Sequence, residues 1–263
     1  MLLWALACGG GIWIRPLLPL DETRYTAVAW EMHRDAQWLV PRLNGEAYHH
    51  KPPLLFWLMQ AGWTAFGPAE IWARLVAPLF GLAAIVLTWR MARMLWPERN
   101  GAAFLAPILL AASGLFAMFS SLVFFDLPLT ACVLVAWLGI LDASAGRPVR
   151  GWLQAGIAIG AGILFKGPVA MLHAGLPALL APVWMRHRRP SPSWPRWYAG
   201  LLCALLAGAV LALAWAIPAA RAGGPEFERM LFFGQHAGRI VGSFQNDKPV
   251  LWYLSVLPPM LLQ

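Results

Sequence analysis

The sequence predicts an all-α, polytopic membrane protein, and three observations lead to this fold class. The 263 residues are 60% hydrophobic and only 12% charged, whereas soluble domains are about half apolar and one quarter charged. The apolar stretches at 101–125, 167–185 and 197–220 are continuous, unlike the strands of membrane barrels, which alternate in segments of about ten residues. The charged residues gather between these stretches, as expected of loops outside a bilayer.

The apolar stretches can be placed as individual spans, because crossing a bilayer takes about 20 mainly apolar residues in a helix. We expect about eight transmembrane helices, near residues 1–20, 70–96, 102–122, 127–143, 151–165, 168–185, 198–220 and from 249 to the end. Residues 1–20 could pass for a signal peptide, but Arg15 interrupts their apolar region and no small-residue cleavage site precedes Asp21, so we expect a retained span. Residues 52–69 begin with two prolines and are rich in Trp and Phe, which favours a helix at the membrane interface.

Arginine is unevenly distributed among the expected loops. One set of loops holds nine arginines and two acids, namely Arg90, Arg93, Arg99, Arg147, Arg150, Arg186, Arg188, Arg189 and Arg196 with Glu98 and Asp142. Loops with such an excess stay cytoplasmic, so the mixed-charge loops, the first at 21–53 and the second at 221–248, are expected to face the periplasm. This topology accounts for the net charge of +8. We expect no nucleic-acid partner, because basic and aromatic residues do not share one accessible face.

Two adjacent carboxylates, Asp21 and Glu22, directly follow the first expected span. At the boundary between water and lipid the pKa values of carboxyl groups shift readily, which suits a catalytic role. A structural alternative is that Asp21 caps the helix that begins near Glu22. The two roles are compatible, because a capping carboxylate can still face a cleft.

A cation, Lys51, stands before Pro52-Pro53 at the start of the interfacial segment. Because proline at the start of a helix presets its first turn, Lys51 and the exposed amides there could bind a phosphate. The alternative is an interfacial lysine that reaches toward lipid headgroups. The neighbouring histidines, His49 and His50, are too few ligands for a metal site on their own.

Asp126 and Lys166 are single charges in otherwise apolar sequence, at the expected outer ends of two helices. A charge at membrane depth is costly and needs a partner or a task. The simplest alternative to a functional role is that the two residues pair with each other or mark helix ends. In the second outer loop, His236 and Arg239 are three positions apart and could share one helical face.

Taken in chain order, these segments resemble bacterial family 39 glycosyltransferases, which include the aminoarabinose transferases that modify lipid A and, more distantly, the protein O-mannosyltransferases. The first loop carries the resemblance through Asp21-Glu22-x-Arg24-Tyr25, Glu31-Met32, Trp38-x-Val40-Pro41, Tyr48 and Lys51-Pro52. It continues at Asp126-x-Pro128, Lys166-Gly167 and Phe232-x-x-x-His236-x-x-Arg239. Family members continue through further helices and a periplasmic domain, so the chain resembles their N-terminal part, with 1–263 as the transmembrane glycosyltransferase domain.

The resemblance implies a membrane fold of the GT-C type and an enzyme of the bacterial inner membrane. Such an enzyme would transfer a sugar, with inversion, from a polyprenyl-phosphate donor to a lipid, glycan or protein acceptor at the periplasmic face. A carboxylate must orient or deprotonate the acceptor, and fixed cations must stabilise the leaving phosphate. The expected catalytic residues are Asp21, Glu22 and Asp126, and the expected substrate-binding residues are Lys51, Arg24, Tyr25, Tyr48, Lys166 and Arg239.

The resemblance also bears on metal dependence. The aminoarabinose transferases have an acid just before the Lys-Pro, and this acid and a second-loop histidine can hold zinc; here His50 replaces the acid, and His236 matches the histidine. A His50/His236 pair would suit zinc, but two ligands are too few for a closed site. We therefore expect that a divalent metal such as zinc can bind at His50 and His236 but that no cofactor is required.

Two other functions fit a membrane protein of this composition. A flippase of lipid-linked sugars would carry charges at mid-membrane and helices broken in related repeats, whereas the charges here cluster at one face. A non-catalytic scaffold would not need an outer loop crowded with Asp, Arg, His and Lys.

Overall fold

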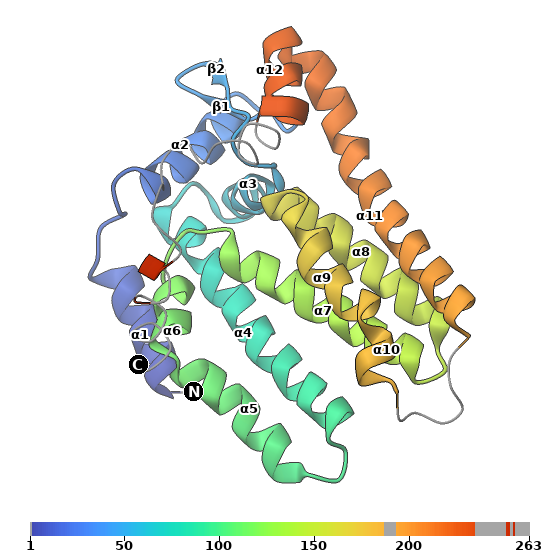
Figure 1. Cartoon of the computed structure of the whole chain (residues 1–263). Helices are drawn as coiled ribbons and strands as arrows, with labels where there is room; N and C mark the ends of the chain where they lie inside the picture. The colour runs from blue at the N-terminus through green and yellow to red at the C-terminus, as the bar shows by residue number, and fades with distance from the viewer. Residues whose placement is uncertain (1, 187–192, 235–250, 253–254, 256–263) are drawn as a thin grey trace. The chain divides into compact units, whose positions relative to one another are not determined.

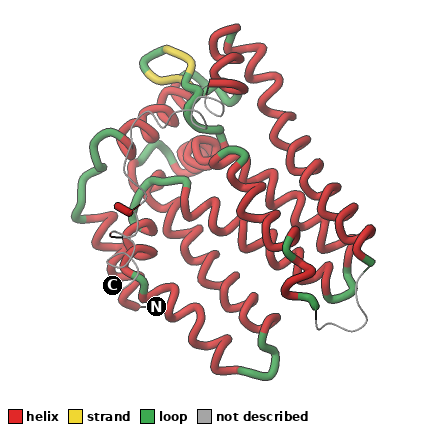
Figure 2. The backbone as a smooth tube through the Cα atoms, viewed as in Figure 1, coloured by secondary structure: helices red, strands yellow, loops and turns green. Residues whose placement is uncertain are grey.

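The computed structural model describes residues 2–186, 193–234, 251–252 and 255, and nearly all of its regular structure is helical (Figure 1, Figure 2). The predicted helical class is confirmed, and the described strands form one short antiparallel hairpin of β1 (Arg42–Leu43) and β2 (Glu46–Ala47). The chain divides into two compact units, which are described separately. Unit 1 comprises Met1–Leu79, Pro107–Phe124 and Ala216–Gln263, and unit 2 comprises Phe80–Ala106 and Phe125–Trp215.

Unit 1 is built around the first helices of the chain. Its elements are α1 (Leu2–Trp13), α2 (Asp21–Arg34), the hairpin, α3 (Leu54–Phe66), the start of α4 (Glu70–Leu95), the end of α5 (Asn100–Ala112), α6 (Gly114–Ser120), the end of α11 (Trp194–Gly223), α12 (Pro225–Arg229) and a π-helical turn, η1 (Met230–Gly234). The Trp4 indole on α1 donates to Ser120 Oγ on α6 at 2.9 Å. Buried Arg74 on α4 donates to the carbonyl oxygens of Gly11 and Ile12, which lack helical partners at the end of α1.

The hairpin orders the loop between α2 and α3. Its turn residues Asn44 and Gly45 have φ values of 54° and 80°, and Asn-Gly is the sequence that favours positive φ at both positions of a two-residue turn. The Glu31 carboxylate on α2 accepts hydrogen bonds from the backbone N–H groups of Asn44 at 2.6 Å and Gly45 at 3.0 Å. The hairpin is therefore fastened to α2.

Unit 2 is centred on a pair of helices, α7 (Asp126–Ser144) and α8 (Pro148–Lys166). It also contains the remaining parts of α4, α5 and α11, together with α9 (Val169–Leu179) and α10 (Ala181–Trp184). Glycines let the two central helices approach closely, because a Cβ atom on Gly139 would lie 2.5 Å from the carbonyl oxygen of Gly151. Small residues in this role are typical of helix pairs in membranes.

Within the part of the chain that the structure describes, fewer helices are long and apolar enough to cross a membrane than the sequence predicts. In the described residues, α4, α7 and α11 are long and apolar enough, and α5 with α6 would make a fourth span although the pair bends by 66°. The helix in the expected first span, α1, has 12 residues, and α9 has 11, which are fewer than a full crossing needs. The count of eight is thus not confirmed, and the span expected from 249 onward lies mostly outside the described residues. The interfacial segment does form a helix, α3.

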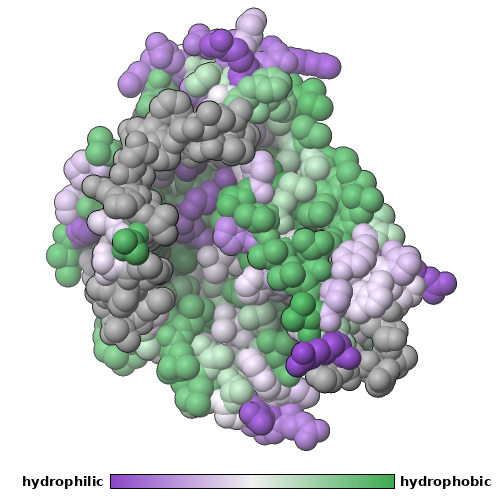
Figure 3. Space-filling view, viewed as in Figure 1, coloured by the Kyte–Doolittle hydropathy of each residue, from purple (hydrophilic) through white to green (hydrophobic). Residues whose placement is uncertain are grey.

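Apolar side chains also cover exposed helix surfaces, as expected of faces turned toward lipid or toward further helices. On α11 the exposed residues include Leu202, Leu206, Val210, Leu213 and Ile217. Figure 3 shows hydrophobic residues along much of this helix.

Candidate functional site

Asp21 is the first residue of α2, and its carboxylate meets two side chains of the same helical turn. Its Oδ1 accepts from Arg24 Nη2 at 2.5 Å and from the Tyr25 hydroxyl at 3.2 Å, because positions three and four residues apart share a helix face. The Asp21 side chain is 46% exposed. The capping alternative is wrong, since the residue that precedes the helix is Leu20 and no side-chain cap is formed. The carboxylate is therefore fixed in direction but open to a ligand.

The groups around Asp21 form an electrostatic cluster within unit 1. Burial raises the pKa of the Tyr25 phenol, and the Asp21 charge raises it further, so Tyr25 stays protonated and can donate. Burial by itself would lower the pKa of Arg24, but the bond to Asp21 and the neighbouring Tyr48 outweigh it and raise that pKa. Of the residues that the sequence predicts, the structure thus brings Asp21, Arg24, Tyr25 and Tyr48 together.

Glu22 has a different environment, because its side chain is fully buried. It forms an ion pair with Arg15 and accepts from the backbone N–H groups of Leu18 and Val123, each at 2.7 Å. Burial raises the pKa of the Glu22 carboxyl, but these donors outweigh burial and lower it below its ordinary value. Arg15 also donates to the Ser121 carbonyl oxygen at 2.9 Å. Glu22 therefore joins α2 to the segment that follows α6.

Lys51 and His50 lie in the turn before α3, where Lys51 is partly buried and His50 is exposed. The His50 ring packs 4.3 Å from the ring of His49 and 5.3 Å from that of Tyr48. The described residues contain no group of three His, Cys, Asp or Glu side chains that could hold a metal ion. His236 and Arg239 lie outside the described residues. The residues that are described do not fit a zinc site.

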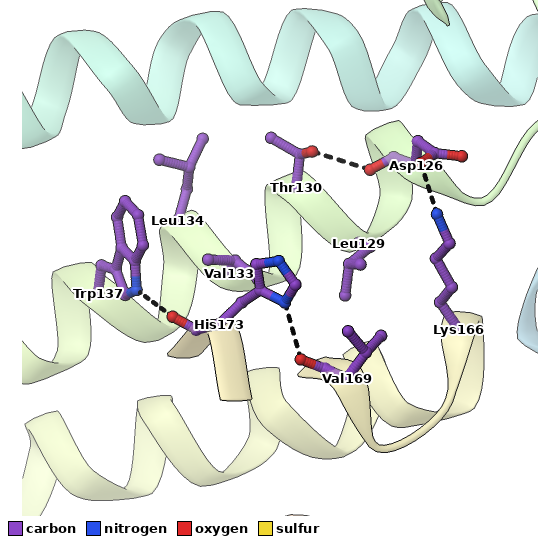
Figure 4. A pocket seen from close by; sticks show the side chains of 9 residues that line it. All are labelled: Asp126, Leu129, Thr130, Val133, Leu134, Trp137, Lys166, Val169 and His173. Atoms are coloured by element: carbon purple, nitrogen blue, oxygen red, sulfur yellow. Dashed lines mark hydrogen bonds and ion pairs between the residues drawn. The ribbon is translucent and has the colours of Figure 1, made fainter. Parts of the chain in front are cut away.

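Asp126 and Lys166 meet in unit 2, as the pairing alternative predicts. Asp126 begins α7 and Lys166 ends α8, and Lys166 Nζ lies 2.5 Å from Asp126 Oδ1 (Figure 4). Each charge suits its place, since helix dipoles favour anions at the start and cations at the end. The α8 helix ends there because Gly167 adopts a φ of 87°, which is easy only for glycine. The side chains are 40% and 29% exposed, so the pair remains within reach of a ligand.

The ion pair stands at one end of a pocket with a volume of about 360 Å³. Leu129, Thr130, Val133, Leu134, Val169 and His173 line its length, and Trp137 lies at the other end in Figure 4. Both of these aromatic groups are fixed, because Trp137 Nε1 donates to the His173 carbonyl oxygen at 3.0 Å and His173 Nδ1 lies 2.8 Å from the Val169 carbonyl oxygen. A pocket with a charged end and a mainly apolar lining suits an amphipathic ligand.

The sequence analysis did not predict that Arg15, Trp137 and His173 belong to the candidate sites. The signal for Arg15 was present, since a cation inside an apolar stretch needs a partner. Val133 and Trp137 lie four positions apart on α7, a spacing that also occurs on any buried helix face. Only the packing of α9 against α7 shows that this face lines a pocket.

Comparisons with known proteins agree on one group of relatives. The family model described as dolichyl-phosphate-mannose-protein mannosyltransferase matches residues 50–215. The undecaprenyl phosphate-alpha-4-amino-4-deoxy-L-arabinose arabinosyl transferase of Erwinia tasmaniensis is 31% identical, over 95% of this chain and 44% of the relative. The enzyme of the same name from Pseudomonas aeruginosa is 33% identical, over 94% of this chain and 44% of the relative.

A solved structure is also similar. The crystal structure of ArnT from Cupriavidus metallidurans bound to undecaprenyl phosphate has a TM-score of 0.77 and 26% identity, and it covers 99% of this chain. The match covers 47% of the ArnT chain. This chain thus spans less than half the length of the relatives that it matches.

Proposed function

This chain belongs to the dolichyl-phosphate-mannose-protein mannosyltransferase family, and on that premise we propose that the complete protein is a membrane glycosyltransferase with a polyprenyl-phosphate sugar donor. The acceptor is a lipid, glycan or protein at the periplasmic face of the inner membrane, and transfer proceeds with inversion. The names of the similar enzymes describe arabinosyl transferases that use an undecaprenyl-phosphate sugar. Those names describe transferases, so we do not retain the flippase alternative.

The observation that carries this proposal is the half-exposed carboxylate of Asp21 beside Arg24 and Tyr25. A glycosyl acceptor needs a carboxylate that orients its hydroxyl and takes its proton. Asp21 has an exposed part for that contact, whereas the Arg24 ion pair and the Tyr25 hydroxyl fix its direction. If the acceptor is a phosphate group that is already ionised, Asp21 orients it instead. Glu22, in contrast, positions α2 and does not touch substrate, because its side chain is fully buried.

We also propose that Lys166 binds the phosphate group of the lipid donor. Sugar transfer leaves negative charge on the departing phosphate, and a fixed cation stabilises that charge. The pocket beside Lys166 is lined mainly by apolar side chains and has the Asp126–Lys166 ion pair at one end, which matches a hydrocarbon chain with a phosphate head. Asp126 holds Lys166 at that end of the pocket before the phosphate binds. Lys51 and Arg239 are proposed as further phosphate contacts. No step requires a metal.

Asp21→Asn tests the role of the carboxylate. The variant keeps the size of the side chain but loses the proton acceptor, so transfer should fall at least about 100-fold. The measurement is mass spectrometry of polyprenyl-phosphate sugar consumed and glycosylated acceptor formed by membranes that contain the complete protein. The matched control is Asp35→Asn, since Asp35 also pairs with a neighbouring arginine on α2 but is exposed at the far end of that helix. If Asp21→Asn were as active as Asp35→Asn and the unaltered protein, Asp21 would have no catalytic role.

Val169→Trp tests the lipid pocket. Val169 lines the pocket, so a larger side chain should obstruct the chain of the donor and raise its KM roughly tenfold. Val183→Trp is the control, because Val183 is 65% exposed on α10 and is not among the residues that line the pocket. An unchanged donor KM in Val169→Trp would show that the donor chain lies elsewhere.

A further inference from the structure

The backbone just before Asp21 has an unusual conformation. Leu20 has a φ of 75° and a ψ of −67°, and the N–H of Asp21 donates to the carbonyl oxygen of Pro19 at 3.1 Å. These are the angles and the hydrogen bond of the rare form of the γ-turn, which is strained for any residue that has a Cβ atom. Leucine therefore occupies a conformation that glycine would adopt more easily.

Bonds on both sides of the turn keep Leu20 in this conformation. The N–H of Leu18 donates to Glu22 Oε2 at 2.7 Å, and the N–H of Thr23 donates to the Leu18 carbonyl oxygen at 3.3 Å. Glu22 is itself fixed by Arg15 and by the backbone of Val123. Strained residues persist only where their surroundings determine the backbone this strongly. The buried Glu22 network thus holds the strained turn in place, and the restricted backbone of Leu20 passes this constraint on to Asp21.

The Leu20 side chain does not explain the strain, because it is 81% exposed and gains no buried contact in return. Leucine does, however, restrict the backbone at position 20 to fewer combinations of φ and ψ than glycine would allow. A glycine in the same place could move among many conformations, and the first turn of α2 would then gain freedom where it holds Asp21. The strained residue, Leu20, therefore directly precedes Asp21, whose carboxylate has the proposed role in transfer.

We propose that Leu20 is a positioning residue, whose strained γ-turn fixes the direction of the Asp21 carboxylate at the start of α2. This inference rests on the proposed role of Asp21 toward the acceptor. Leu20 acts through the backbone and does not touch the reacting atoms. A loss of this restraint changes how often Asp21 is correctly aimed, and small errors in the placement of a reacting group cost rate more than binding.

Leu20→Gly in the complete protein tests the inference, with transfer kinetics and the melting temperature measured together. We expect kcat to fall roughly tenfold, the KM for the polyprenyl-phosphate sugar to stay within about twofold, and the melting temperature to be unchanged or higher because strain is relieved. The matched control is Ala36→Gly. Ala36 is also a non-glycine residue with positive φ, at 52°, but it is exposed beyond the C-terminal end of α2. Its replacement should leave kcat unchanged.

Leu20→Ala separates the backbone from the side chain. Alanine keeps the Cβ atom and the strain but removes most of the exposed side chain, so its kcat should fall far less than that of Leu20→Gly. An equal loss in both variants would assign the effect to a contact of the leucine side chain and overturn the inference. A parallel fall of kcat and melting temperature in Leu20→Gly would also overturn it, because the turn would then be merely structural.

Asp21→Asn distinguishes failure of the inference from failure of the proposed function. If Asp21→Asn is inactive but Leu20→Gly has the kcat of the unaltered protein, the proposed function stands and the positioning role is wrong. If Asp21→Asn is fully active, both are wrong.

Discussion

Asp21 and Glu22 are adjacent on α2 but point in different directions, because successive residues of a helix are about 100° apart. Asp21 faces Arg24, Tyr25 and open space, whereas Glu22 faces the interior of unit 1. Carboxylates placed in different environments take different roles. Of the two carboxylates at the start of α2, Asp21 is therefore available for chemistry, whereas Glu22 holds the helix in position.

Glu22→Gln should unfold more easily than the unaltered protein. The change leaves Arg15 beside a neutral side chain in a buried network, and breaking such a pair costs about 3 kcal/mol. The measurement is urea unfolding of the detergent-solubilised protein. Glu46→Gln is the control, since Glu46 is exposed on the hairpin and its replacement should change the stability little.

The stability that Glu22 contributes should depend on pH. Its pKa lies below the ordinary value of 4.5 in the folded protein, so the unfolded chain takes up a proton first as the pH falls. The contribution is complete above pH 4.5 and is lost as the pH falls through the lower pKa of the folded state. The difference in unfolding free energy between the unaltered protein and Glu22→Gln should therefore shrink in that range. A constant difference would contradict the network as described.

At the scale of helices, sequence patterns located α7 and α8 to within a few residues. The expected ranges of 127–143 and 151–165 compare with Asp126–Ser144 and Pro148–Lys166. Pro148 at the start and Gly167 at the end of α8 are the signals that set its limits. Continuous apolar sequence bounded by such residues contains enough information for a helix.

The same patterns could not locate breaks inside apolar sequence. The single helix expected at 102–122 is bent by 66° between α5 and α6, where Ser113 accepts from the N–H of Phe116. Hydropathy does not change at this point, so only the local cap marks it. The expected span at 168–185 is likewise divided into α9 and α10. Composition decides whether a segment is apolar, and local hydrogen bonds decide where it bends.

The candidate sites were predictable where short spacing along one helix or an isolated charge in apolar sequence marks the partners. The contacts of Asp21 with Arg24 and Tyr25 follow from spacing along one helix, and the pair of Asp126 with Lys166 follows from two isolated charges of opposite sign. The partner of Glu22 at Val123 is 101 positions away in the chain. A backbone N–H has no sequence signature, so the burial of Glu22 could not be foreseen.

Gly139→Ala should destabilise the pairing of α7 with α8. Its Cβ atom would lie 2.5 Å from the Gly151 carbonyl oxygen, and backbone cannot move aside as a flexible side chain can. Overpacking of this kind costs about 1–3 kcal/mol, measurable as a lower melting temperature in detergent. Gly101→Ala is the control, because a Cβ atom there meets nothing within 4 Å. Equal melting temperatures in the two variants would contradict the close approach of α7 and α8.

At the scale of the whole molecule, the charged loops and the apolar helix surfaces are both features of a membrane protein. Several helices expose large apolar side chains, among them Leu206 and Val210 on α11, which suits contact with lipid. Arg93 lies in the last turn of α4, and Arg99 lies in the segment that joins α4 to α5. Arginine-rich regions of this kind remain on the cytoplasmic side. The hairpin between α2 and α3 is expected on the opposite side.

Labelling of introduced cysteines tests this topology. In a protein whose native Cys8, Cys132 and Cys203 are replaced by alanine, Glu46→Cys should react with a membrane-impermeant maleimide in intact spheroplasts. Arg99→Cys should react only after the membrane is permeabilised, because arginine-rich loops are retained inside. Both positions are exposed in the structure, so a difference in labelling reports the side of the membrane and not burial. Labelling of Arg99→Cys in intact spheroplasts, with Glu46→Cys protected, would place the Asp21 loop in the cytoplasm. The proposed transfer at the periplasmic face would then be wrong.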